Sequence, residues 1–453
     1  MKAPFQITKL DYWVYGVSLA LCFLLFKQSD LTVTNNASFA YLNGHFWDFY
    51  DYNKAYFDNN YLPIFYWIFA LWNLPLKLLG FIPQISQDNW LSSTPIVTIW
   101  SKLLITIFFF AAVSLIKKIS EQIVFSQAAT NDPQQSISPN LIFATSPFAI
   151  FAVFIFGGYD IFGIFFTLLG LRAYFSKKFK WFIFWFSVAI SFKYFAAFIY
   201  LPLVLIVEKR ITHLLVFGLL GLAGTVLQLA LYWHSSTFLH EMVYLIGTKT
   251  TDTSVRWRLI LALVAYALMC LYLYFSKLDF KTEARKWRRC AIFSCLIAYA
   301  LLFSSVRWHP QWLILIIPFI CLSYLFVKSQ KSLLIIESLG YLGFIALCIN
   351  TWIGNVDVNM VYGGVLGELV PKAHLLGSDL IGRHALGISR AAFYIFLYSP
   401  ILVLIWEKCF LAKGTLGSSL KLPIVAFQIR FFIGIYFFIA LTLACVWFAI
   451  NSG

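Results

Sequence analysis

Residues 213–233 read HLLVFGLLGLAGTVLQLALYW, a stretch without Lys, Arg, Asp or Glu. An α-helix needs about 20 mostly apolar residues to cross the hydrocarbon core of a bilayer. Inside that core the backbone must satisfy its own hydrogen bonds, which a helix achieves. The stretch therefore predicts a transmembrane helix.

Comparable apolar runs recur along the whole chain. They lie near 11–26, 62–83, 96–116, 141–157, 160–175, 181–206, 213–233, 257–276, 290–305, 311–327, 332–351, 390–406 and 431–450. The composition agrees, because 61% of the residues are hydrophobic and only 12% are charged, whereas soluble domains carry about 25% charged residues. The mean hydropathy is +0.80. We predict an all-α polytopic membrane protein.

Two of the runs depart from the pattern of a simple span. The run 62–83 contains three prolines and Lys77, which suits a helix lying at the membrane interface. The run 181–206 carries Lys193 at its middle, followed by Pro202. Because a charge at that depth is costly unless it faces a cavity or a partner, we expect two short half-spans that meet near Lys193.

The basic residues indicate the orientation. The net charge of +15 is typical of nucleic-acid binding or of cytoplasmic membrane loops. Thirteen crossings with a cytoplasmic N-terminus place 22 of the 34 Lys and Arg inside, and changing one assignment moves clusters such as 277–289 or 117–118 outside. The positive-inside rule therefore favours this topology, with 27–61, 234–256 and 352–389 as outer segments.

The first outer segment contains GHFWDFYDYN at 44–53. Asp48 and Asp51 lie among aromatic residues, a setting in which a carboxylate can act as a general base. Tyr52 can stack on a sugar face. An interfacial belt of aromatic residues without catalytic function is the alternative.

Two further positions combine charge with an unusual location. Asp160 follows Gly157 and Gly158 at a predicted helix start, where it either caps the helix or takes part in a site. Lys193 is a candidate functional residue because of its depth, with Asp160 as a candidate partner.

Cationic groups follow on the same predicted side. Arg307, His309 and Gln311 lie in one turn at an outer span junction, and Arg256 and Arg258 end another outer segment. Arg and His suit a phosphate oxygen or a sugar hydroxyl. Non-specific contact with lipid headgroups is the alternative.

These patches, in this order, resemble the GT-C superfamily of integral-membrane glycosyltransferases, above all the glycosylphosphatidylinositol mannosyltransferase I catalytic family and its bacterial relatives. The matching positions are Asp48, Asp51, Tyr52, Tyr61-Leu62-Pro63, Ser146-Pro147, Gly158-Tyr159-Asp160, Phe192-Lys193-Tyr194, Leu201-Pro202, Pro310-Gln311-Trp312 and Pro318. The likeness covers roughly 11–325. The acids are spaced Asp-Phe-Tyr-Asp rather than Asp-x-Asp, which leaves open which one corresponds to the catalytic acid of the family.

The resemblance implies a GT-C-like catalytic module at 1–325, including an outer loop at 27–95 with interfacial helices, and additional transmembrane helices at 326–453 with an outer loop at 352–389. It implies inverting transfer of a hexosyl group, such as mannosyl, from a polyprenyl-phosphate donor to a lipid-linked or cell-envelope glycan on the extracytoplasmic face. We expect the base to be Asp48 or Asp51. The acceptor or the sugar is expected to be oriented by Asp160, Lys193, Tyr52 and Gln311. The donor phosphate is expected to be bound by Arg256, Arg258, Arg307 and His309.

No Walker loop, dinucleotide fingerprint or zinc motif occurs in a credible context, so we expect no nucleotide as partner. The distribution of Lys and Arg along the predicted cytoplasmic segments argues against nucleic acid as partner. No cofactor is expected, although a divalent metal held by two acids is an alternative. A small membrane subunit is an open alternative as a partner. A bacterial cytoplasmic membrane is favoured over the endoplasmic reticulum. A polysaccharide polymerase or ligase and a lipid-linked glycan transporter remain the alternative functions.

Overall fold

The structure is a computed structural model of the 453-residue chain. It describes residues 8–57, 59, 61–86, 89–125, 138–248, 253–276, 284–352, 356, 358–365, 367, 383–410, 428, 430–435, 438–440, 442–443 and 447. Within these ranges every regular element is a helix and no strand occurs. The predicted all-α class is therefore confirmed for the described part.

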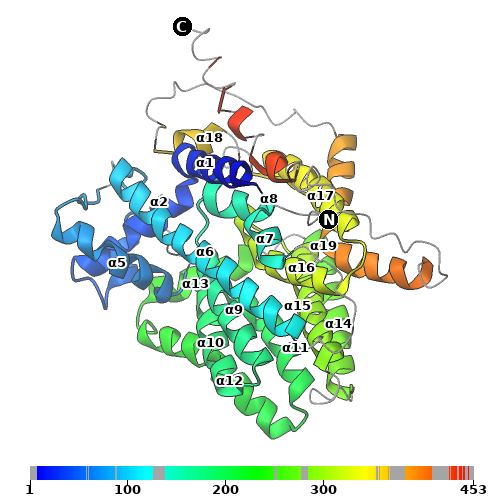
Figure 1. Ribbon diagram of the computed structural model, residues 1–453. Helices are drawn as coiled ribbons and strands as arrows, with labels where there is room; N and C mark the ends of the chain where they lie inside the picture. Colours follow the sequence, from blue (N-terminus) through cyan, green and yellow to red (C-terminus); the bar gives the residue numbers. More distant parts are fainter. Residues whose placement is uncertain are drawn as a thin grey trace. The chain divides into compact units, whose positions relative to one another are not determined.

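Six helices among the described residues are long and apolar enough to cross a membrane. They are α6 (Pro95–Phe125), α12 (Ile211–Leu231), α14 (Thr253–Phe275), α15 (Ala284–Ser305), α17 (Gln330–Thr351) and α19 (Arg383–Phe410) (Figure 1). α12 and α14 expose large apolar side chains such as Leu219 and Leu268. Contiguous apolar surface of this kind needs a lipid or protein neighbour. These are the helices of a multi-pass membrane protein.

The remaining predicted crossings correspond to shorter or interrupted helices, so thirteen crossings are not confirmed. α9 (Ile161–Phe175), α10 (Phe179–Phe192) and α11 (Ala197–Val207) have 15, 14 and 11 residues. At 1.5 Å per residue they extend about 17–23 Å, less than the ~30 Å hydrocarbon core. The run 431–450 lies partly outside the described residues.

The expected break at Lys193 is present. α10 ends at Phe192, Lys193 has extended φ and ψ of −146° and 107°, and a short 3₁₀ turn, η2 (Tyr194–Ala196), leads into α11. The predicted continuous span at 141–157 is, by contrast, interrupted between α7 (Pro139–Ala144) and α8 (Pro147–Ile150). Pro147 has no N–H to continue the helical ladder, which explains the interruption.

The chain divides into two compact units. Unit 1 comprises 1–28, 134–157 and 323–453, and unit 2 comprises 29–133 and 158–322. Two earlier segments thus belong to the same unit as the C-terminal helices. The other helices of unit 2 are α2 (Ser29–Ala37), α3 (Phe39–Leu42), α4 (Phe49–Asn53), α5 (Pro63–Leu78), α13 (Ser236–Thr248), η3 (Pro310–Leu315) and α16 (Ile317–Ser323).

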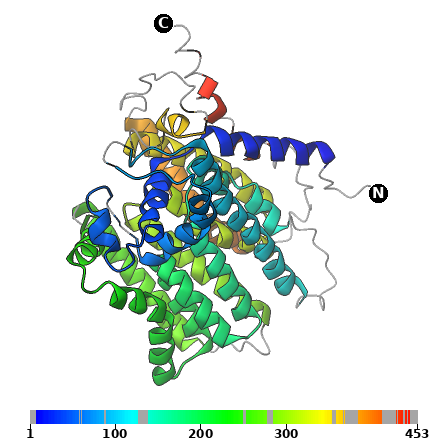
Figure 2. The ribbon, with the colours of Figure 1, turned by 90° about the vertical axis from the view of Figure 1, so that its left-hand side faces the viewer.

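Unit 2 is built on helices that pack side by side. α9 packs against α6 and α10, and α10 in turn against α12, while α11, α14 and α15 pack together (Figure 1); the green helices are seen from another side in Figure 2. A Cβ at Gly170 of α9 would lie 2.5 Å from the ring of Phe186 on α10. Only glycine permits this approach. The 16-residue α5 is not one of the six long helices, and its place at the interface stays a prediction.

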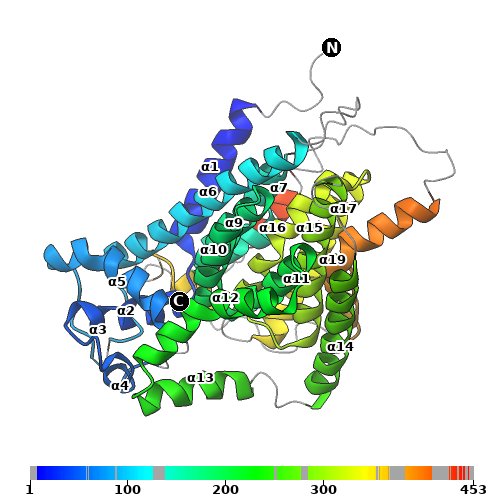
Figure 3. The ribbon, with the colours of Figure 1, turned by 90° about the horizontal axis from the view of Figure 1, so that it is seen from below.

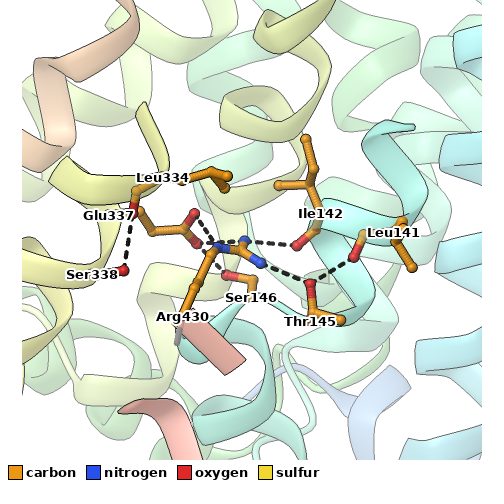
Figure 4. A network of polar contacts seen from close by, with 8 residues as sticks. All are labelled: Leu141, Ile142, Thr145, Ser146, Leu334, Glu337, Ser338 and Arg430. Atoms are coloured by element: carbon orange, nitrogen blue, oxygen red, sulfur yellow. Dashed lines mark hydrogen bonds and ion pairs between the residues drawn. The ribbon is translucent and has the colours of Figure 1, made fainter. Parts of the chain in front are cut away.

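Unit 1 also contains α1 (Lys9–Leu25), η1 (Phe151–Ile155), η4 (Tyr324–Phe326) and α18 (Val358–Tyr362). α17 and α19 pack closely, since a Cβ at Gly343 would lie 2.5 Å from the backbone oxygen of Ser389. A buried polar network joins α17 to the α7–α8 corner (Figure 4). In it Arg430 donates to both carboxylate oxygens of Glu337 at 2.7 and 2.9 Å, to Thr145 and to the carbonyl of Ile142.

Candidate active site

The most unusual group in unit 2 is a buried ion pair. The Nζ of Lys193 lies 2.6 Å from Oδ1 of Asp160, and their side chains are 4% and 1% exposed. Asp160 precedes α9, yet its side chain makes no capping hydrogen bond. The capping alternative is therefore excluded, and the pairing of Lys193 with Asp160 agrees with the sequence prediction.

Aromatic rings enclose the ammonium group. Lys193 Nζ lies 4.9 Å from the ring centroid of Tyr61 and 4.8 Å from that of Trp312. A cation within about 6 Å of such a ring is attracted by its quadrupole. The site thus combines an acid, a cation and two ring faces, contributed by the start of α9, the α10–α11 break, the segment before α5 and η3.

The ion pair retains capacity for hydrogen bonding. The contact has the distance of an ion pair but not the angles of a hydrogen bond, and neither carboxylate oxygen of Asp160 has a hydrogen-bond partner among the described residues. Buried polar groups normally have such partners. A ligand that both donates to a carboxylate and accepts from an ammonium, as a hydroxyl does, would satisfy both groups.

A second acid, Asp30 in the first turn of α2, lies beside η3. Gln311 Nε2 donates to Asp30 Oδ2 at 3.3 Å, and His309 Nδ1 lies 3.3 Å from Gln311 Oε1 and 4.0 Å from Asp30 Oδ2. The side chains of Asp30 and His309 are 32% and 27% exposed. Asp30 is therefore accessible, whereas Asp160 is not.

Tyr61 connects the two acids. Burial raises the pKa of its phenol well above the ordinary value, and the nearby carboxylates of Asp160 and Asp30 raise this pKa further. Tyr159, whose ring meets that of Tyr61 at 5.4 Å, shares a 2.7 Å hydrogen bond with Thr34 of α2. Asp30, Asp160, Lys193, His309 and Gln311 thus belong to one site in unit 2.

The acids of the first outer segment make other contacts. Asp48 pairs with His45 at 2.9 Å, and Ser235 donates to Asp51 at 3.0 Å. The ring of Tyr52 stacks on His45 at 3.6 Å. Asp51 and Tyr52 lie in α4, which follows Asp48 and which Figure 3 shows next to α13. Among the described residues, no hydrogen bond or ion pair joins Asp48 or Asp51 to the site around Lys193.

The three predicted phosphate-binding arginines are solvent-exposed. Arg256 and Arg258 lie in the first turns of α14, and Arg307 lies between α15 and η3. Only Arg307 is close in sequence to the site, two residues before His309. Ser146, which belongs to the family resemblance, donates to Glu337 in unit 1.

Asp30 was missed from the sequence. It follows the first apolar run and belongs to none of the patches that the sequence predicts as functional. Its position as the first acid after a span was the available signal. Among the described residues no group of three His, Cys, Asp or Glu side chains could hold a metal ion.

No protein-family model matches the chain, and no curated protein matches it significantly.

Proposed function

We propose that this chain is an inverting membrane glycosyltransferase of the GT-C type. It moves a hexosyl group, such as mannosyl, from a polyprenyl-phosphate donor to a lipid-linked or cell-envelope glycan. The reaction takes place on the extracytoplasmic face of a bacterial cytoplasmic membrane. The topology that goes with this proposal has thirteen crossings and a cytoplasmic N-terminus, supported by the distribution of Lys and Arg.

The observation that carries the proposal is the convergence around Lys193. An accessible carboxylate, a buried ion pair with unfilled hydrogen-bonding capacity, two aromatic faces and a histidine come from five separate segments of unit 2. A buried pair of charged side chains in a membrane protein is by default a candidate functional site.

We assign the general base to the acid of this site that is accessible. Asp30 takes the proton of the acceptor hydroxyl, whose oxygen then attacks the anomeric carbon while the bond to the lipid phosphate breaks. General-base assistance contributes roughly 10²–10⁴-fold to such a step. The contacts favour Asp30 as the base over Asp48 and Asp51, because Asp30 contacts Gln311 of this site, whereas Asp48 and Asp51 contact His45 and Ser235.

The buried pair suits a neutral sugar better than an anion. Asp160 cancels the charge of Lys193, so a phosphate would gain little there, whereas a sugar hydroxyl that reached this enclosed pair could donate to Asp160 and accept from Lys193. His309 and Arg307 lie at the accessible side, where fixed cations stabilise the charge that develops on the leaving phosphate. Arg256 and Arg258 remain further candidates for that role, and Gln311 and Tyr52 for orienting the acceptor.

The test follows label from a radiolabelled polyprenyl-phosphate hexose into glycolipid and glycan, in membranes that contain the expressed chain. Mannosyl and glucosyl donors are both supplied, and a labelled diphosphate-linked oligosaccharide is supplied in a parallel reaction. We expect Asp30→Asn to reduce transfer about 10²–10⁴-fold, and Asp48→Asn and Asp51→Asn to reduce it by less than tenfold.

The outcomes separate the assignments. Loss of transfer in Asp48→Asn or Asp51→Asn, with Asp30→Asn still active, would return the base to the aromatic outer segment. Wild-type membranes that use only a diphosphate-linked oligosaccharide would identify a ligase and refute the proposed donor. The absence of transfer from every donor would refute the proposed reaction.

A further inference from the structure

Gln311 bridges the two groups at the site that can exchange protons. Its amide lies between Asp30 and His309, with both contacts at 3.3 Å. The direct separation of Asp30 Oδ2 and His309 Nδ1 is 4.0 Å, too long for a hydrogen bond. The arrangement of protons between Asp30 and His309 therefore depends on Gln311.

The directions of these hydrogen bonds can be derived from the acid. An ionised carboxylate only accepts, so the amide nitrogen of Gln311 must face Asp30. The amide oxygen then faces His309, and because that oxygen only accepts, His309 must donate from Nδ1. The neutral imidazole is held with its proton on Nδ1 and its lone pair on Nε2.

The backbone holds Gln311 in this position. Pro310 begins η3, and the N–H of Trp312 donates to the carbonyl of His309 at 3.0 Å. The side chain of Gln311 is buried, with the residue 1% exposed, so it has little freedom to rotate. Its amide is a fixed element of the site and not an adaptable surface group.

We propose that Gln311 is a positioning residue that fixes the tautomer of His309 and thereby directs Nε2 to the donor phosphate. This role rests on the proposed glycosyl transfer. In that reaction the acceptor proton passes to Asp30, and the electron pair of the broken carbon–oxygen bond remains on the phosphate. His309, when protonated, donates from Nε2 to that phosphate oxygen. His309 donates only a hydrogen bond and keeps its proton, and exchange with water returns the proton of Asp30 to solvent.

The test of the tautomer does not depend on activity. Protein labelled with ¹⁵N-histidine is reconstituted in lipid, and its imidazole nitrogens are observed by solid-state NMR at about pH 8.5, where an ordinary histidine is neutral. The chain has seven histidines, and His309→Gln identifies the resonances of His309. We expect the Nδ1–H form in the wild type and the Nε2–H form, which imidazole prefers in water, in Gln311→Met.

A matched control keeps the test specific. Gln122→Met makes the same substitution on α6, where Gln122 donates to Ser176, and should leave the His309 resonances unchanged. An Nε2–H tautomer in the wild type would overturn the inference. So would an Nδ1–H form that persists in Gln311→Met.

Kinetics test the consequence for catalysis. We expect Gln311→Met to lower kcat roughly 10–100-fold with little change in donor KM, as when the partner of an oriented histidine is removed. Gln311→Glu retains an acceptor toward His309 but not the donor toward Asp30, so it should restore the Nδ1–H form without restoring kcat. A wild type that shows the Nδ1–H form but transfers no sugar would refute the proposed function and leave the tautomer assignment standing.

Discussion

Replacing Arg430 by Met removes the cation from a buried network that joins separate segments of unit 1. Arg430 and Glu337 have side chains that are 0% and 2% exposed. All three guanidinium nitrogens donate hydrogen bonds, two of them to Glu337 at 2.7 and 2.9 Å. Figure 4 shows these contacts converging from the α7–α8 corner, α17 and Arg430.

The magnitude follows from what the substitution leaves behind. In Arg430→Met the carboxylate of Glu337 stays buried and keeps Ser146 as a donor. Leaving one member of a buried ion pair unpartnered costs about 3–5 kcal/mol. Replacing both members by apolar residues of similar volume is often neutral or stabilising. We therefore expect Arg430→Met to unfold far more readily than Arg430→Met/Glu337→Leu.

The assay measures unfolding of the purified protein in detergent, by heat or by SDS titration. It compares the wild type, Arg430→Met, Glu337→Leu and the double variant. A positive coupling energy in this cycle measures the ion pair. If Arg430→Met is as stable as the wild type, the network does not hold unit 1 together. If the double variant is no more stable than Arg430→Met, the loss comes from packing and the reasoning from unpaired charge is refuted.

Two further predictions concern helix packing and pH. Gly343→Ala should destabilise unit 1 by about 1–3 kcal/mol, because the added Cβ meets the backbone of Ser389. The control is Gly218→Ala, whose added Cβ meets nothing within 4 Å and which should unfold like the wild type. Equal stability of the two variants would contradict the close packing of α17 and α19. Glu208 accepts hydrogen bonds from Arg210, which together with its other donors lowers the pKa of the carboxyl below its ordinary value. Its contribution to stability is therefore present above the ordinary pKa of Glu and is lost as the pH falls below it. Between about pH 6 and pH 3, the thermal stability of Glu208→Gln should fall less than that of the wild type. An equal fall in thermal stability would exclude this linkage.

The sequence by itself determined the class of the protein and one contact of the candidate site. Long apolar runs indicate membrane helices because the thickness of the bilayer sets their length, and this is a local property. The same reasoning located the break at Lys193, since the cost of a buried charge requires a partner within reach. Asp160, in the glycine-rich turn before α9, was the predicted partner, and in the structure it lies 2.6 Å from Lys193.

Only the tertiary structure decided which other acid reaches the site. Asp48 and Asp51 are prominent in the sequence because aromatic residues surround them. Local composition does not determine which way a side chain points, and in the structure these two acids contact His45 and Ser235. Asp30 approaches Gln311 across 281 positions of sequence. No periodicity or spacing encodes a contact of that range, since it depends on how α2 and η3 pack. The pairing of Arg430 with Glu337 had the same origin: each residue alone resembles an ordinary charge near a span, and only the folded chain buries them together.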